Sequence, residues 1–123
     1  MTPDPFQNLK KAIQGLEYPS ESDAPFDSFQ WPASKAASAL QQVTAHTAAN
    51  RKIIEVPINS FFDALKDSDD APRFLELRRT LESTLTNIKI FRAGEGETKI
   101  DIYVIGKTQS GDWAGLHTTS VET

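Results

Sequence analysis

The residues of this sequence that are best placed to do chemistry are carboxylates gathered in two stretches. The first spans residues 17–27, contains no Lys or Arg, and holds four acids, Glu17, Glu21, Asp23 and Asp27. The second runs from residue 108 onward, also without Lys or Arg, and holds Asp112, Glu122 and the carboxylate of Thr123. Carboxylates displayed without bases suit a basic partner. Charge runs are more commonly solvated surface, so composition leaves both interpretations open.

Two other stretches resemble ion-binding motifs but fail on spacing. An EF-hand loop starting at Asp67 needs Gly sixth and Glu twelfth, where this chain has Pro72 and Arg78. The segment "AGEGETK", residues 93–99, lacks the four residues that a phosphate-binding loop places between its first Gly and its Gly-Lys-Ser/Thr. We therefore interpret the first as a solvated loop before a helix and the second as a hairpin turn.

The only two histidines are His46 and His117. A catalytic triad assembles in space, so the sequence leaves a histidine-dependent hydrolase open as a third possibility. No serine lies in a G-x-S-x-G elbow, and isolated histidines are mostly structural or surface residues. We interpret Trp31 and Trp113 as packing residues.

Bulk composition limits the class of protein further. The chain has 123 residues, enough for a single domain over residues 1–123, and a net charge of −4, which disfavours direct nucleic-acid binding. There is no cysteine, so neither a disulfide nor a zinc–thiolate site is possible. The N-terminal segment lacks the pattern of a signal peptide, and no apolar run approaches the roughly 18 residues that cross a bilayer. We expect a soluble, cytoplasmic, acidic protein.

Hydrophobic periodicity predicts helices in the first two thirds of the chain, with two strands among them. The predicted helices are Pro5–Leu16, capped by Asp4, then Ser34–His46, a short helix from Asn59, and Ala71–Asn87. The predicted strands are Phe26–Trp31 and Arg51–Val56. The stretch "EYPSESDAP", residues 17–25, has two prolines and three acids and predicts an exposed loop.

The C-terminal third predicts a three-stranded meander. Residues 87–93 and 99–106 alternate as strands around the glycine-containing "GEGET", and a last strand follows "TQSGD". Ile100, Ile102 and Val104 should point to one face, and Asp101, Tyr103 and Ile105 to the other. A meander places residues near Thr123 at the end of the sheet that holds Ile90–Ala93. The whole pattern predicts an α+β domain with a largely antiparallel sheet.

Several stretches together resemble a known family. They are "YPSESDAPFDSFQW", "INSFFDAL", "RAGEGE" with its R-x-G-E pattern, and "KIDIYVIGKTQSGDWAGLHTTSVET". In this order the chain resembles the nuclease A inhibitor family, small cyanobacterial-type proteins. The resemblance covers most of the chain and is most specific over residues 99–123. No single stretch is a strong motif; the ordered set carries the resemblance.

The resemblance implies a fold and a function. The implied fold is an α-β-α sandwich similar to plant pathogenesis-related type 1 proteins. The implied function is inhibition of a sugar-non-specific endonuclease with a ββα-metal active site, by a protein that is not an enzyme, has no cofactor or metal of its own and is a monomer when free. An alternative is a module of the same fold with a different protein partner.

The resemblance also implies contact residues. Glu21 would engage basic residues of the nuclease, and the carboxylate of Thr123 would reach the region of its catalytic magnesium. Glu122 ranks lower, and the neighbours of Glu21 complete the expected site, namely Ser20, Ser22 and Asp23. The chain departs from the family at residues 66–74, "KDSDDAPRF", where a longer acidic and aromatic loop is compressed. Contacts made by that loop are therefore in question.

Overall fold

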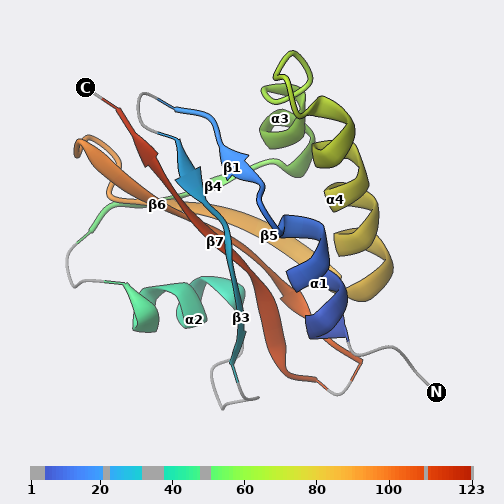
Figure 1. The fold of residues 1–123 in the computed structure, drawn as a ribbon. Coiled ribbons are helices and arrows are strands. Elements are labelled where there is room, and N and C mark those ends of the chain that lie inside the picture. The colour runs from blue at the N-terminus through green and yellow to red at the C-terminus, as the bar shows by residue number, and fades with distance from the viewer. Residues whose placement is uncertain (1–4, 21–22, 32–37, 48–50, 110, 123) are drawn as a thin grey trace.

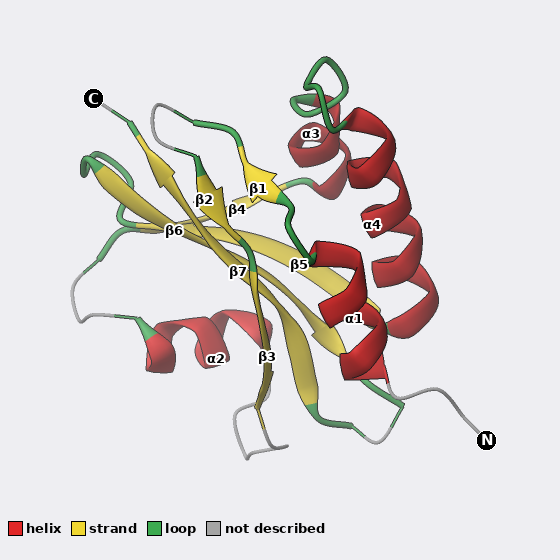
Figure 2. Cartoon of the chain, in the orientation of Figure 1, coloured by secondary structure: helices red, strands yellow, loops and turns green. Residues whose placement is uncertain are grey.

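The fold is built around one antiparallel sheet that carries helices on both of its faces (Figures 1 and 2). The computed structural model describes residues 5–20, 23–31, 38–47, 51–109 and 111–122. Its elements are α1 (Pro5–Ile13), β1 (Glu17–Tyr18), β2 (Ala24–Pro25), β3 (Asp27–Trp31), α2 (Ala39–His46), β4 (Ile53–Val56), α3 (Ile58–Asp63), α4 (Ala71–Thr84), β5 (Thr86–Ala93), β6 (Lys99–Lys107) and β7 (Trp113–Val121). The main sheet has the strand order β3-β7-β6-β5-β4, and β1 pairs with β2 beside it. This mixture of helices with an antiparallel sheet confirms the α+β class.

Successive side chains of β6 point to opposite faces of the sheet, and the hydrophobic core is divided into two clusters, one on each face. Ile102 and Val104 are buried with residues of α1, α3 and α4. Tyr103 and Ile105 point to the opposite face, where they are buried with Val43 of α2. The predicted facing of β6 is therefore confirmed, because successive side chains of a strand point to opposite faces. Each fully buried Leu or Ile contributes roughly 1.5–3 kcal/mol.

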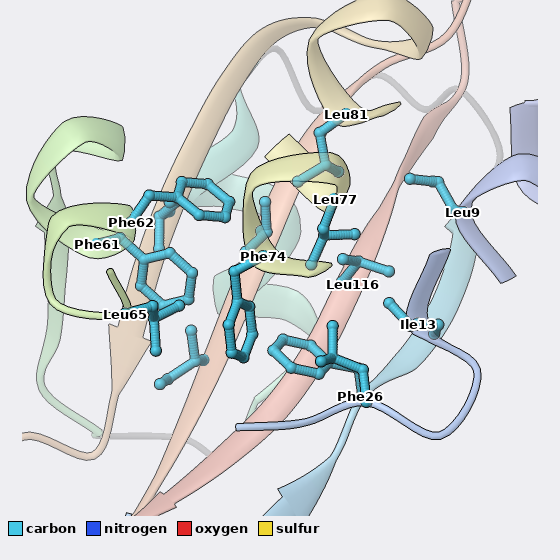
Figure 3. Packing of buried hydrophobic residues seen from close by; sticks show 14 of the residues in the cluster. Leu9, Ile13, Phe26, Phe61, Phe62, Leu65, Phe74, Leu77, Leu81 and Leu116 are labelled. Carbon is cyan, nitrogen blue, oxygen red and sulfur yellow. The ribbon is translucent and has the colours of Figure 1, made fainter. Parts of the chain in front are cut away.

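The larger cluster holds the helical layer against the sheet (Figure 3). Leu9 and Ile13 of α1 are buried in it, together with an apolar stripe of α4 made of Phe74, Leu77 and Leu81. The meander β5-β6-β7 is paired antiparallel throughout, as predicted. Over the described residues, no helix combines the length and the apolar character that a membrane crossing requires.

Helix boundaries differ from the prediction at four places, and one of them is the start of α3, at Ile58 and not Asn59. Helix α1 ends at Ile13, before Leu16, because Gly15 adopts a φ of +73°. Helix α4 ends at Thr84, and Asn87, predicted as its last residue, has a φ of +53° inside β5. Helix α2 is capped by Ser38, whose side chain accepts from the Gln41 amide at 3.2 Å. The predicted caps Asp4 and Ser34 lie outside the described residues.

The acidic stretch at residues 17–25 is more ordered than the exposed loop that was predicted. Tyr18 pairs with Ala24 across β1 and β2. The Tyr18 ring stacks on Phe61 with centroids 5.7 Å apart, and its edge meets Phe26 at 6.2 Å. One aromatic side chain thus anchors an otherwise polar segment to the core, which local composition did not reveal.

Candidate partner-binding site

Three segments that are distant in sequence meet at one end of the sheet (Figure 1). They are the connection between β1 and β2, the end of β7, and the connection between β5 and β6. Contacts of both β1 and β2 with β7 bring the first two segments together. Residues expected to contact a partner from the first and from the last part of the chain therefore share one surface.

Residues of the N-terminal segment hydrogen-bond to the outer edge of β7. Strand β3 pairs with β7 only from Trp113 to His117, so the following residues have no strand on that side. There the Thr118 hydroxyl donates to the carbonyl of Pro25 at 3.0 Å, and the amide of Val121 donates to Ser20 Oγ at 3.1 Å. The exposed end of the strand is satisfied by hydrogen bonds to residues of the acidic stretch.

Glu122 is engaged by a group that we call the Arg92 cluster, comprising Arg92, Glu95, Ser120 and Glu122. Glu122 Oε2 lies 2.6 Å from Arg92 Nη2 and accepts the Ser120 hydroxyl at 2.7 Å. Arg92 Nε also donates to Glu95 Oε2 at 3.0 Å. The hydrogen bond from Ser120, together with that from Arg92, lowers the pKa of Glu122 against the opposing effect of burial. The expectation that the chain end lies beside Ile90–Ala93 is confirmed by this contact.

Tyr18 connects the Arg92 cluster to the acidic stretch. Burial raises the pKa of Tyr18, the charge of Arg92 opposes that rise, and the charge of Glu122 adds to it. The charges that influence the Tyr18 phenol thus belong to the Arg92 cluster.

Segment 66–74 lies against the same acidic stretch. Asp69 and Asp70 line a recess of about 150 Å³ together with Glu17 and Asp23. Asp23 Oδ1 also accepts the Ser20 amide at 3.4 Å. This segment therefore adds two carboxylates to those of the acidic stretch. Among the described residues, no group of three His, Asp or Glu side chains is arranged to hold a metal ion.

The predicted site residues fall into three groups. Ser20, Asp23 and Glu122 lie together at this end of the molecule, whereas Glu21, Ser22 and Thr123 lie outside the described residues. Asp112 precedes β7 and Glu122 follows it. Nine residues of strand separate them, about 30 Å at ~3.3 Å per residue, so the two acids do not act at one place.

A second ionic group on the opposite face was not anticipated. This Arg51 cluster comprises Arg51, Glu97, Asp101 and His117. Arg51 bonds to Asp101 and, through Nε, to Glu97 Oε2 at 3.1 Å, while His117 Nε2 lies 2.9 Å from Asp101 Oδ1. Burial tends to raise the pKa of Asp101, but the hydrogen bonds from Arg51 and His117 outweigh it and lower that pKa.

The other histidine is held by packing. The His46 ring stacks on Trp31 with centroids 3.6 Å apart, and its Nδ1 lies 2.8 Å from the carbonyl of Gln42. Both histidines thus have structural partners, which favours their interpretation as structural residues. The sequence signal for the ionic groups was weak, because Arg92 and Asp101 find their partners only after the strands pair. The R-x-G-E pattern at residues 92–95 was the one visible indication.

Comparison with known proteins assigns the chain to a family. A family model described as nuclease A inhibitor-like protein matches residues 4–123, nearly the whole chain. No curated protein matches the chain.

Proposed function

Because the chain belongs to the nuclease A inhibitor-like family, we propose that it binds a sugar-non-specific, metal-dependent endonuclease and occludes its active site. The proposal rests chiefly on one observation. Ser20 of the acidic stretch accepts a hydrogen bond from the amide of Val121 at the end of β7, which supports a shared surface for the two segments that we propose as contacts.

Electrostatics explains why such a surface suits such an enzyme. A nuclease without sequence preference must bind the phosphate backbone, so its cleft is basic and holds a divalent metal ion. Carboxylates placed where phosphates would lie use the same field. Association is then accelerated by charge and weakened by salt. We propose that Glu21 meets basic residues of the nuclease and that the Thr123 carboxylate approaches its metal.

This role is that of a stoichiometric protein inhibitor with no cofactor of its own and no direct binding to nucleic acid. We also propose that the free protein is a monomer and is cytoplasmic, and that its fold is similar to the α-β-α sandwich of plant pathogenesis-related type 1 proteins. Sedimentation of the free protein tests the first of these.

The direct test is titration of the protein into an assay of a ββα-metal nuclease. We expect removal of Thr123, or Glu21→Gln, to cost ~2–5 kcal/mol of binding free energy, the range for a desolvated interfacial charge. Glu76→Gln is the matched control, because Glu76 is an exposed acid on α4 with a side chain 69% accessible. Equal potency of the intact and truncated chains would remove the terminal contact, and no inhibition of any such nuclease would remove the function.

The acidic recess provides a second, smaller test. Asp69→Asn and Asp70→Asn should each weaken binding by less than about 1 kcal/mol, mainly through a slower association rate, because exposed charges at an interface rim act over distance. Stopped-flow association kinetics at two salt concentrations measure this. An unchanged association rate would mean that the compressed segment 66–74 takes no part.

A second candidate is a module of the same fold that binds another protein, and the shortened segment 66–74 favours it. Affinity capture from the native host separates the two candidates. Recovery of a nuclease supports inhibition, whereas reproducible recovery of a different protein at stoichiometric amounts supports the alternative.

A further inference from the structure

Three residues form hydrogen bonds at the end of β7, namely Ser20, Arg92 and Glu122. Each of them is already bonded within the protein. Glu122 has one carboxylate oxygen bonded by both Arg92 and Ser120. Ser20 Oγ accepts the amide of Val121. Because these groups bond to one another or to the backbone, we consider which segments of the chain they hold in position.

The register of β7 explains why Ser20 is needed. The amide of Glu122 points toward β6, where it donates to the carbonyl of Thr98 at 2.7 Å. Backbone amides alternate in direction along a strand, so the amide of Val121 points away from β6. Strand β3 has ended by this position, and Ser20 Oγ is the acceptor found there. A residue of the β1–β2 connection thereby completes the backbone pairing of β7.

Arg92 holds the same strand end from the face of the sheet. It lies on β5, two strands away from β7, and its side chain is only 20% accessible. Its guanidinium bonds Glu95 through Nε and Glu122 through Nη2. A planar guanidinium that is bonded at both Nε and Nη2 has little rotational freedom. The residue before Thr123 is therefore fixed from a second direction, independent of Ser20.

We propose that Ser20, Arg92 and Glu122 are positioning residues: they join the β1–β2 segment to the end of β7 and order, before binding, the residues that flank the proposed contacts. The inference rests on the proposed function. Groups ordered before binding lose less conformational entropy on association, so affinity depends on residues that need not touch the partner. Glu122, first expected as a contact, is reassigned to this supporting role.

A double-mutant cycle distinguishes positioning from general stabilisation. Ser20→Ala and Arg92→Gln are made in the intact chain and in a chain that lacks Thr123 and carries Glu21→Gln. We expect each to weaken inhibition about tenfold in the intact chain and by less than about twofold in the second, because coupled residues are non-additive. Ser20→Thr, which retains the hydroxyl, should restore potency. Equal losses in both chains would overturn the inference.

Matched controls exist elsewhere in the chain. Arg78→Gln removes an arginine of similar exposure, with a side chain 26% accessible and paired with Glu82. Ser83→Ala removes a hydroxyl that donates to the carbonyl of Thr80. Both controls should leave inhibition within about twofold of the original, since additivity holds for distant sites.

Amide hydrogen exchange of the free protein gives a readout without nuclease. Ser20→Ala should accelerate exchange at Val121 about tenfold or more while leaving Ile102, in the centre of the sheet, unchanged. Unchanged exchange at Val121 would overturn the inference. An intact chain that inhibits no nuclease overturns the proposed function. Fully potent Ser20→Ala and Arg92→Gln variants overturn the positioning role alone.

Discussion

The Arg51 cluster and the Arg92 cluster lie on opposite faces of the sheet beside the same β5–β6 connection, and they hold different things. In the Arg51 cluster the arginine binds Asp101, which lies within β6, and Asp101 in turn meets His117 within β7. In the Arg92 cluster the arginine binds Glu122, which lies beyond the last strand. Similar chemistry therefore joins strands on one face and fixes a strand end on the other.

This difference separates stability from function. An ionic group that joins strands already paired by backbone hydrogen bonds contributes mainly to the free energy of unfolding. An ionic group that fixes the end of a strand instead determines the position of the residue that follows the strand. We therefore expect loss of the Arg51 cluster to be seen in denaturation and loss of the Arg92 cluster to be seen in binding.

The largest loss of stability is expected from Gly94→Ala, because the added methyl group would displace the side chain of Arg51. Gly94 has a φ of +102°, and an added Cβ would lie 2.2 Å from Arg51 Nη2. Backbone strain and the displaced arginine together should cost on the order of 2–4 kcal/mol in unfolding free energy. Urea denaturation measures this cost.

Gly96→Ala is the control for that substitution. Gly96 has a φ of +92° but nothing within 4 Å of an added Cβ, so it reports backbone strain alone. A loss as large as that of Gly94→Ala would show that the Arg51 cluster is not responsible.

The next effect compares the two arginines directly. Arg51→Gln leaves Asp101 without its main charged partner and should cost about 1.5–3 kcal/mol of stability, the range for hydrogen bonds to charged groups. Inhibition by the folded variant should stay within about twofold of the original, in contrast to Arg92→Gln. Parallel denaturation and inhibition assays test both. If Arg51→Gln impairs inhibition as strongly as Arg92→Gln, the two clusters do not differ in role.

Acid should weaken both clusters, with the smallest effect of the series. The pKa values of Asp101 and Glu122 are lowered in the folded protein from their ordinary values of 3.8 and 4.5. Their contribution is therefore complete above the unfolded pKa values and is lost as the pH falls through the folded ones. We expect the free energy of unfolding to decline below about pH 4.5.

Asp101→Asn and Glu122→Gln should each remove part of that decline, and a titration of unfolding free energy against pH measures it. If both variants keep the full acid dependence, other carboxylates are responsible. NMR titration of the Asp101 and Glu122 side chains shows how much of the acid dependence comes from the Arg51 cluster and how much from the Arg92 cluster.

Local pattern was sufficient for most of the regular structure. The stripe of α4 and the alternation of β6 follow from short-range periodicity, because burying an apolar face dominates where an element forms. Gly15 was a visible stop signal for the first helix, but the end of the long helix was not predictable. Asn87 interrupts its helical pattern through backbone conformation, and the choice depends on what the next element pairs with. The β1–β2 pair depended on the Tyr18 ring reaching Phe61, a tertiary contact.

The sequence by itself determined the hydrophobic pattern, the acidic stretches and the ordered set of segments that identify the family. It determined them because apolar period, charge and residue order are local properties. Only the tertiary structure decided which acids act together. Pairing of β7 with β6 brings Glu122 to Arg92, the end of β3 leaves the amide of Val121 for Ser20, and the length of β7 separates Asp112 from both. Those relations depend on register and strand length, which arise only when distant segments pair.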